Sequence, residues 1–232
     1  MDCILFRLDE KMDNGFICIC CKRRTSYKES VISEKYLGLC KGCNDKISYF
    51  PDGTVFKGSD NLSSLFSVVE YKGVIGSAIR RYKFSGQQRY SKIFVEMMYE
   101  YFKGMGLERE YDLMTMVPLS RKRLLERGYC QTELLAKPLA EKLGIEFRNN
   151  CIFKNRNNKA QSTTRDLPER KINVKDVYIA NAEKIKGKNI ILVDDVYTTG
   201  STMEECAKEL KNKGAKNVLG ITLAKAVRKE YK

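Results

Sequence analysis

The chain has 232 residues, of which 43% are hydrophobic and 31% are charged, and its formal net charge is +14. This composition supports a folded core, and no apolar run reaches the about 18 residues that a transmembrane helix needs. Histidine is absent, which excludes Ser-His-Asp and Cys-His catalysis and any imidazole metal ligand.

The positive charge is unevenly distributed along the chain. Residues 1–61 hold 10 Lys and Arg against 9 Asp and Glu, whereas residues 71–171 hold 21 against 11. A basic excess of this size attracts polyanions such as nucleic acid, single-stranded DNA in particular, anionic lipid or phosphorylated small molecules, although a lysine-rich surface is the alternative explanation. The N-terminus has no basic segment before its short apolar stretch, so we expect no signal peptide, no membrane insertion and a cytoplasmic location.

The first motif is a pair of cysteine clasps. Cys18 and Cys21 form one C-x2-C, and Cys40 and Cys43 form a second after 18 intervening residues. This spacing is typical of a structural four-cysteine zinc site, in which four thiolates complete a tetrahedron and leave no open position for substrate. Cys20 is an alternative partner in the first clasp, and Cys3 is a further spare. Free thiols or a disulfide are the other interpretation, and a reducing compartment disfavours the disulfide.

A loop-like segment separates the cysteines from the rest of the chain. Pro, Gly, Asp and Ser cluster between residues 48 and 61, which is the chemistry of turns and linkers. We therefore predict a zinc-ribbon domain over residues 1–60 and a second domain over residues 61–232.

The second domain alternates predicted strands and helices. Strands are expected at 65–71, 112–117, 189–193 and 218–223, and helices at 74–82, 90–104, 132–143 and 201–213. Pro138 should kink or divide the third helix, and Gly144 should end it. Tyr82 and Phe84 are expected to pack in the core. The alternation predicts an α/β fold with a mostly parallel sheet and helices on both faces.

Three cations follow the strand at 112–117. Ser120 is followed by Arg121, Lys122 and Arg123 in a segment that we expect to be a loop. Because loops at the carboxyl ends of parallel strands face the ligand crevice, Arg121 and Lys122 are predicted to bind a pyrophosphate. A solvated basic turn is the alternative.

The most informative stretch is "IILVDDVYTTGSTMEE". Asp194 and Asp195 end a strand of the buried type, and the hydroxyls of 198–202 lead into a helix. The acids suit sugar hydroxyls or a cation, and the helix N-terminus with its hydroxyls suits a monophosphate, so the order fits a ribose 5-phosphate. The stretch lacks the glycine pattern of P-loops and of dinucleotide-binding folds. An ordinary capped helix explains "STMEE" but not the double aspartate.

These residues also carry a resemblance. "ILVDDVYTTGST" resembles the phosphoribosyl pyrophosphate (PRPP) signature of type I phosphoribosyltransferases. Together with "VPLSRKRLLERGYCQTELLA", "QSTTRDLPERKINVKDVYIA" and the cysteine clasps, it is similar to the ComF family of competence proteins over nearly the whole chain. The family usually has Asn where this chain has Cys130.

The resemblance implies a type I phosphoribosyltransferase-like domain behind a zinc ribbon, with PRPP and Mg²⁺ as ligands and DNA uptake as the process. Arg127, Gly128, Tyr129 and Gln131 would cover the site, with Gln161, Arg170 and Asn173 completing the cover. Competence-machinery proteins are expected to contact the ribbon. The predicted catalytic residues are Asp194, Asp195, Arg121 and Lys122, and the predicted PRPP-binding residues are Asp194, Asp195, Thr198, Thr199, Gly200, Ser201, Thr202, Arg121, Lys122, Arg127, Gln131 and Gln161.

The sequence does not show which base or other nucleophile a transferase would use. A nucleobase-salvage phosphoribosyltransferase and a non-catalytic, PRPP-responsive nucleic-acid-binding regulator therefore remain alternatives.

Overall fold

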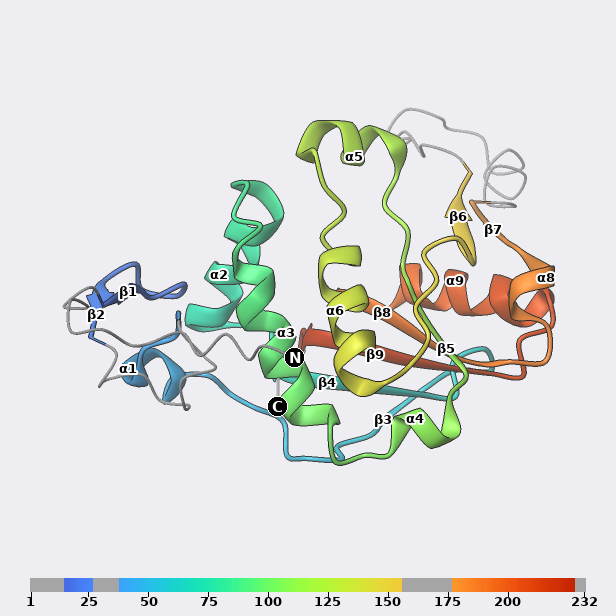
Figure 1. Cartoon of the computed structure of the whole chain (residues 1–232), viewed down its shortest axis with the longest axis horizontal. Coiled ribbons are helices and arrows are strands. Elements are labelled where there is room, and N and C mark those ends of the chain that lie inside the picture. Colours follow the sequence, from blue (N-terminus) through green and yellow to red (C-terminus); the bar gives the residue numbers. More distant parts are fainter. Residues whose placement is uncertain (1–14, 27–37, 156–176, 228–232) are drawn as a thin grey trace, which may run out of the picture.

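A computed structural model describes residues 15–26, 38–155 and 177–227, and its centre is a five-stranded sheet (Figure 1). The strand order is β3-β4-β9-β8-β5, with β4, β9, β8 and β5 parallel and β3 antiparallel at one edge. The strands are β3 (Phe56–Lys57), β4 (Ser64–Glu70), β5 (Leu113–Met116), β8 (Asn189–Tyr197) and β9 (Asn217–Lys225). The predicted mostly parallel sheet is confirmed.

Strands β8 and β9 lie inside the sheet, and their side chains are buried on both of its faces. Ile190 to Val193 have no exposed surface, as expected for a parallel strand covered from both sides. The sequence predicted the end of β8 at Val193, but the strand continues to Tyr197. It does so because β9 keeps pairing with it as far as Tyr197 and Lys225, whereas β5 already ends opposite Val193.

Helices cover both faces of the sheet, as predicted. On one face, apolar side chains of α2 (Gly73–Phe84), α3 (Tyr90–Phe102) and α6 (Glu133–Leu143) pack against the odd-numbered residues of β8, such as Ile191. On the other face, α9 (Ser201–Asn212) and α8 (Ala182–Ile185) pack against the even-numbered residues, such as Leu192. A short helix, α4 (Leu107–Glu110), precedes β5. Among the described residues, no helix has the length and apolarity to cross a membrane.

Helix α6 runs through Pro138 as one helix and ends where the sequence predicts. Gly144 adopts a left-handed conformation with φ of 71°, and its N–H closes the last turn by bonding to the carbonyls of Ala140 and Glu141. Such an end is typical of a glycine at a helix C-terminus, because glycine tolerates positive φ.

Helix α5 (Arg121–Arg127) replaces the loop that we expected after β5. Ser120 caps its start by accepting a hydrogen bond from the N–H of Arg123 at 3.3 Å, and Gly128 ends it with φ of 73°. None of its seven residues is buried, so the helix depends on capping and good helix formers rather than on core packing. Figure 1 shows α5 at the top, away from the sheet.

The described part of the N-terminal segment contains β1 (Phe16–Ile17), β2 (Arg24–Thr25) and α1 (Lys41–Asn44). It lies beyond α2 at the left of Figure 1. The chain then reaches the main sheet before residue 60, because Phe50 donates to the carbonyl of Val68 at 3.0 Å and β3 pairs with β4. The domain boundary at residue 60 stays a prediction. Strands β6 (Ile152–Lys154) and β7 (Tyr178–Ala180) form a separate antiparallel pair.

Candidate functional site

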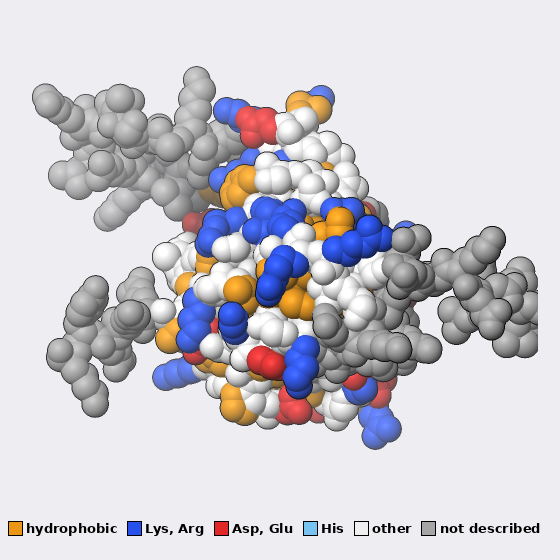
Figure 2. All heavy atoms as spheres, turned by 90° about the vertical axis from the view of Figure 1, so that its left-hand side faces the viewer, with side chains coloured by type: hydrophobic (Ala, Val, Ile, Leu, Met, Phe, Trp, Pro, Cys, Tyr) orange, Lys and Arg blue, Asp and Glu red, His pale blue; other side chains and the backbone are white. Residues whose placement is uncertain are grey.

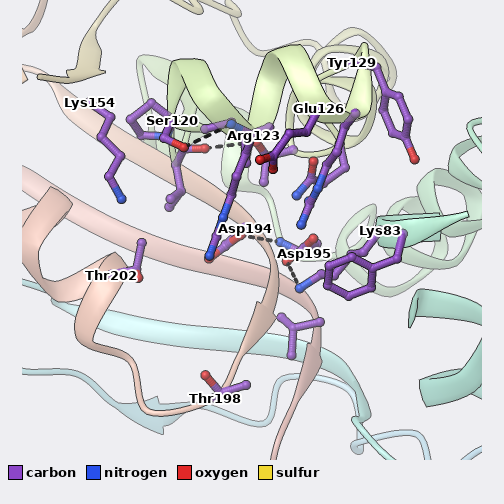
Figure 3. Close-up of a pocket in the computed structure, with 18 of the residues that line it drawn as sticks. Lys83, Ser120, Arg123, Glu126, Tyr129, Lys154, Asp194, Asp195, Thr198 and Thr202 are labelled. Carbon is purple, nitrogen blue, oxygen red and sulfur yellow. Dashed lines mark hydrogen bonds and ion pairs between the residues drawn. The ribbon is translucent and has the colours of Figure 1, made fainter. Parts of the chain in front are cut away.

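A pocket of about 680 Å³ opens at the carboxyl ends of β5 and β8. This is the position at which α/β sheets bind ligands. Its walls come from the end of α2, the segment from β5 through α5 to the start of α6, the β6–β7 pair, and the end of β8 (Figure 3). The lining residues are Lys83, Phe84, Gly86, Val117, Pro118, Leu119, Ser120, Arg123, Glu126, Arg127, Tyr129, Gln131, Thr132, Lys154, Tyr178, Asp194, Asp195, Val196, Thr198 and Thr202.

The two aspartates both reach the pocket, but from different sides of their strand. Because β8 continues past them, Asp194 follows the parity of Leu192 toward the α9 face and Asp195 that of Ile191 toward the α2 face. Asp195 is buried, and its Oδ1 lies 2.8 Å from Nζ of Lys83. Its Oδ2 is buried and has no hydrogen-bond partner among the described residues. One oxygen is thus paired, and the other is left for a ligand.

Asp194 has a raised pKa. Its Oδ1 accepts a hydrogen bond from the N–H of Asp195 at 2.8 Å, which favours the carboxylate. Burial opposes ionisation more strongly, and the negative charge of Asp195 adds to it, so the pKa of Asp194 lies well above its usual range. A cation or a hydroxyl donor in the pocket would reverse this balance.

The pH dependence of stability should report this raised pKa. In the folded state the charges of Asp195 and Lys83 act on Asp194, and its own charge acts on Tyr178 and Cys206. Its folded pKa exceeds the unfolded value of about 3.9, so its contribution to stability is present below that value and is lost as pH rises through the folded pKa. The Tm of the ligand-free wild type, minus that of Asp194→Asn, should therefore fall as pH rises from about 4 to 8. A difference that stays constant with pH would contradict the raised pKa.

A smaller cavity of about 50 Å³ adjoins the pocket at the start of α9. The predicted hydroxyl loop lines it, and Thr199 and Ser201 lie within hydrogen-bond distance of each other at 3.1 Å. Gly200 has φ of 83° and passes directly under the ring of Tyr197, so a side chain there would collide with the tyrosine. The free N–H groups of the first turn of this 12-residue helix make the cavity suitable for a phosphate.

Some of the predicted cations line the pocket and others lie outside it. Arg121 and Lys122 lie on exposed positions of α5 and do not line the pocket, and Lys122 pairs with Glu126 at 3.8 Å. Arg123, two residues further along, points from α5 toward the aspartates in Figure 3. Arg127 also lines the pocket, and its predicted role in PRPP binding stays a prediction. Arg123 reaches the pocket while Arg121 and Lys122 do not, because successive residues of a helix point in different directions.

The cover of the site is partly described. Tyr129 and Gln131 line the pocket, and Gly128 ends α5. Gln161, Arg170 and Asn173 lie outside the described residues. Cys130 does not line the pocket: its Sγ lies 4.0 Å from Sδ of Met116 and 3.2 Å from Oγ1 of Thr132.

Sequence reasoning missed the contribution of helix α2. Tyr82 is fully buried, as predicted, but the prediction for Phe84 was wrong, because 71% of its surface is exposed and it lines the pocket beneath the guanidinium of Arg127 at 4.9 Å. Lys83, between them, pairs with Asp195. No local motif marks these residues, since their role follows from where the end of α2 lies in the fold. Lys154 and Tyr178 reach the pocket from β6 and β7 in the same way.

The four predicted cysteines converge. The Sγ atoms of Cys18, Cys21, Cys40 and Cys43 all lie within 4.8 Å of one another, and those of Cys21 and Cys40 are 3.9 Å apart. A tetrahedral zinc with Zn–S bonds of about 2.3 Å needs sulfur atoms about 3.8 Å apart, so the cluster fits this metal. Cys20 is buried beside the cluster and is not one of the four, and Cys3 lies outside the described residues.

Comparison with known proteins agrees with this arrangement. A model of the phosphoribosyl transferase domain matches residues 132–232. Among curated proteins, Competence protein ComFC of Streptococcus pneumoniae is 30% identical over 159 residues, covering 68% of this chain and 67% of its own. The chain belongs to the ComF family. Competence protein F of Haemophilus influenzae is 26% identical, over 91% of this chain and 98% of its own. The DNA utilization protein YhgH of Escherichia coli is 27% identical, over 92% of each chain.

Solved structures also overlap with this ComF-family chain. An adenine phosphoribosyltransferase of Thermoanaerobacter pseudethanolicus is 19% identical over 80% of this chain and 98% of its own, with a TM-score of 0.37. A glutamine PRPP amidotransferase of B. subtilis is 22% identical over 52% of this chain, which spans 25% of that protein, with a TM-score of 0.36. The superpositions are partial, so the fold class rests on the family membership, the matched domain and the observed strand order. These confirm a phosphoribosyltransferase-like sheet behind a four-cysteine segment.

Proposed function

We propose that the pocket binds PRPP together with Mg²⁺. The observation that carries this proposal is the placement of Asp194 and Asp195 beside the phosphate-sized cavity at the start of α9. A ribose 5-phosphate that spans the acids and this cavity would have the carboxylates at its hydroxyls and the helix N–H groups at its phosphate. Arg123, Arg127 and Lys154 line the same pocket and would face the pyrophosphate.

If the protein is a transferase, the chain supplies electrostatic stabilisation rather than a histidine base. Asp194 and Asp195 would hold Mg²⁺ when it is bound, and the metal would supply positive charge for a pyrophosphate leaving group. Arg123 and Arg127 would stabilise the same leaving group, and the two carboxylates would orient the ribose, whose transition state resembles an oxocarbenium ion. Arg121 and Lys122 remain proposed contributors only if α5 moves, because their side chains lie outside the pocket.

A structural zinc ion is proposed for the four-cysteine cluster. The sulfur separations fit a tetrahedral site, and the segment's two-residue strands and four-residue helix are too short to be stable alone. With four thiolates around it, the metal would have no open position for chemistry. Its proposed roles are to fold the segment and to present it to protein partners.

The biological role proposed for the chain is DNA uptake during natural transformation, in the cytoplasm. The curated relatives support it by name, because they are called competence proteins and DNA utilization proteins. The charge distribution adds support. Figure 2 shows Lys and Arg side chains gathered across the middle of the face that contains the N-terminal segment, with fewer Asp and Glu.

Single-stranded DNA binding would follow from that charge and should depend steeply on salt. A protein that neutralises several phosphates releases counterions, so affinity for an oligonucleotide should fall at least about tenfold between 50 and 200 mM salt. Fluorescence anisotropy with a labelled 20-nucleotide strand measures this. If the strand does not bind even at 50 mM salt, the DNA-binding part of the proposal is wrong.

The pocket assignment is tested by comparing two ligands on the wild type. Calorimetric titration with PRPP and Mg²⁺ should give one site per chain, and ribose 5-phosphate should occupy the same site more weakly because it lacks the pyrophosphate. Competition between the two shows whether the site is shared. If neither ligand binds at millimolar concentration, the proposed function fails.

A further inference from the structure

Lys83 holds one of the two proposed ribose-binding acids in place. It is the penultimate residue of α2, and its Nζ lies 2.8 Å from Oδ1 of Asp195. The lysine side chain is 20% exposed and that of the aspartate 4%, so water screens the pair only weakly. The pair keeps Asp195 compensated before any ligand or metal arrives, and it directs the unpaired Oδ2 away from the lysine.

The residue before Lys83 fixes the end of α2 from the pocket side. Tyr82 is fully buried, and its hydroxyl donates to the carbonyl of Gln131 at 2.7 Å. The hydroxyl of Tyr129 in turn donates to the carbonyl of Tyr82. The last turn of α2 is therefore tied to the segment between α5 and α6 that lines the pocket.

Arg81, the residue before Tyr82, connects the last turn of α2 to the cysteine segment. Nη2 of Arg81 donates to the carbonyls of Ile19 and Cys20, at 2.5 and 2.8 Å. Both carbonyls lie inside the first C-x2-C clasp, between Cys18 and Cys21. Because a clasp holds this shape when its two thiolates share a metal, the acceptors for Arg81 exist in this position only while the clasp is formed.

We propose that Lys83 is a positioning residue for Asp195, and that Arg81 makes its placement depend on the cysteine cluster. Consecutive residues of one helical turn thus join the metal centre to the ligand pocket. Figure 1 shows α2 between the cysteine segment and the rest of the fold. The inference rests on the proposed function for its ligand, but the mechanical link between cluster and helix can be measured without any ligand.

Hydrogen exchange measures the link directly. Removing the metal with a chelator that prefers zinc to Mg²⁺ should increase amide exchange in the last turn of α2, residues 81–85, by about tenfold or more in the wild type. Arg81→Met should show the faster exchange already with metal bound, and chelation should then add little. If exchange in this turn is unchanged by both chelation and Arg81→Met, the link does not exist.

Ligand binding tests the role of Lys83 and has a signature that general loss of structure would not give. Lys83→Met removes the countercharge of Asp195. The apparent affinity of this variant for Mg²⁺ in the presence of PRPP should therefore rise, while the affinity of the variant for PRPP should fall about tenfold or more. Lys83→Arg keeps the charge and should recover most of the PRPP affinity. Equal loss in both variants, or an unchanged Mg²⁺ dependence in Lys83→Met, would overturn the positioning role.

The two proposals fail in different ways. If the wild type binds no PRPP but chelation loosens the last turn of α2, the proposed function is wrong and the link between cluster and helix stands. If the wild type binds PRPP with the same affinity before and after chelation, the function stands and the link to the pocket is wrong.

Discussion

Asp195→Asn should weaken the binding of PRPP and Mg²⁺ by about 100-fold, because charge-assisted hydrogen bonds to sugar hydroxyls or to metal-bound water contribute about 1.5–3 kcal/mol each. The substitution keeps the shape of the side chain and removes its charge. It also leaves Lys83 without its partner at 2.8 Å. Calorimetric titration with PRPP at fixed Mg²⁺ measures the change in Kd.

The loss of the ion pair will also lower stability, and the two effects must be separated. Breaking a buried pair costs about 3–5 kcal/mol, and the partial exposure of Lys83 reduces this figure. Thermal unfolding therefore accompanies the titration, which is performed well below the Tm of the variant. Asp60→Asn is the matched control, since it removes the same charge from an exposed residue outside the pocket. An Asp195→Asn protein that is folded and binds PRPP like the control would contradict the assignment.

Cys18→Ser should abolish stable zinc binding, whereas Cys20→Ser should retain it. Cys18 is one of the four cysteines whose sulfurs converge, and Cys20 lies beside them without joining the set. Structural zinc sites contribute about 10–16 kcal/mol of apparent binding free energy, so removing one thiolate should unfold the segment around the cluster. Elemental analysis should give about one zinc per chain for the wild type and for Cys20→Ser, and a small fraction of that for Cys18→Ser.

Limited proteolysis provides the second measurement for the cysteine pair. Cleavage within residues 15–26 and 38–47 should become fast in Cys18→Ser and remain slow in Cys20→Ser, because only the first variant loses the metal proposed to hold these residues together. If Cys20→Ser loses zinc while Cys18→Ser keeps it, Cys20 is the ligand. Zinc below about one half per chain in the wild type would remove the metal centre altogether.

The features that sequence predicted well are those fixed by short spacing along the chain. The two C-x2-C clasps specify a local turn and therefore converge as expected. The apolar run before Asp194 predicts a central strand, and the hydroxyl loop before α9 predicts a phosphate-sized cavity. In each case the residues that form the feature are neighbours in sequence, so their geometry follows from local backbone preferences.

The features that sequence missed depend on where whole elements lie. Lys83 meets Asp195 across more than one hundred residues, and nothing near Lys83 in the sequence marks that contact. The position of Arg123 rather than Arg121 at the pocket follows from the helical form of α5, which the sequence predicted as a loop and whose start Ser120 caps. The opposite sides taken by Asp194 and Asp195 follow from strand alternation, which becomes visible only once β8 is known to extend to Tyr197.

Together these observations describe a ComF-family chain in which one pocket collects groups from distant elements. Lys83 of α2 balances the charge of Asp195, and the phosphate-sized cavity lies at the start of α9. The acids come from β8 and the cations from α5 and β6, which matches a ligand that has hydroxyls at its centre and phosphate groups at both ends.

Hydrogen exchange of the wild type with and without PRPP and Mg²⁺ shows whether PRPP binds at the carboxyl end of β8. We expect slower exchange in residues 194–203 and in the pocket-lining segment 121–131, with little change in residues 41–47 of the cysteine segment. Protection confined to another surface, such as the pocket lined by Glu133, Lys137 and Arg148, or no protection at saturating ligand, would contradict it.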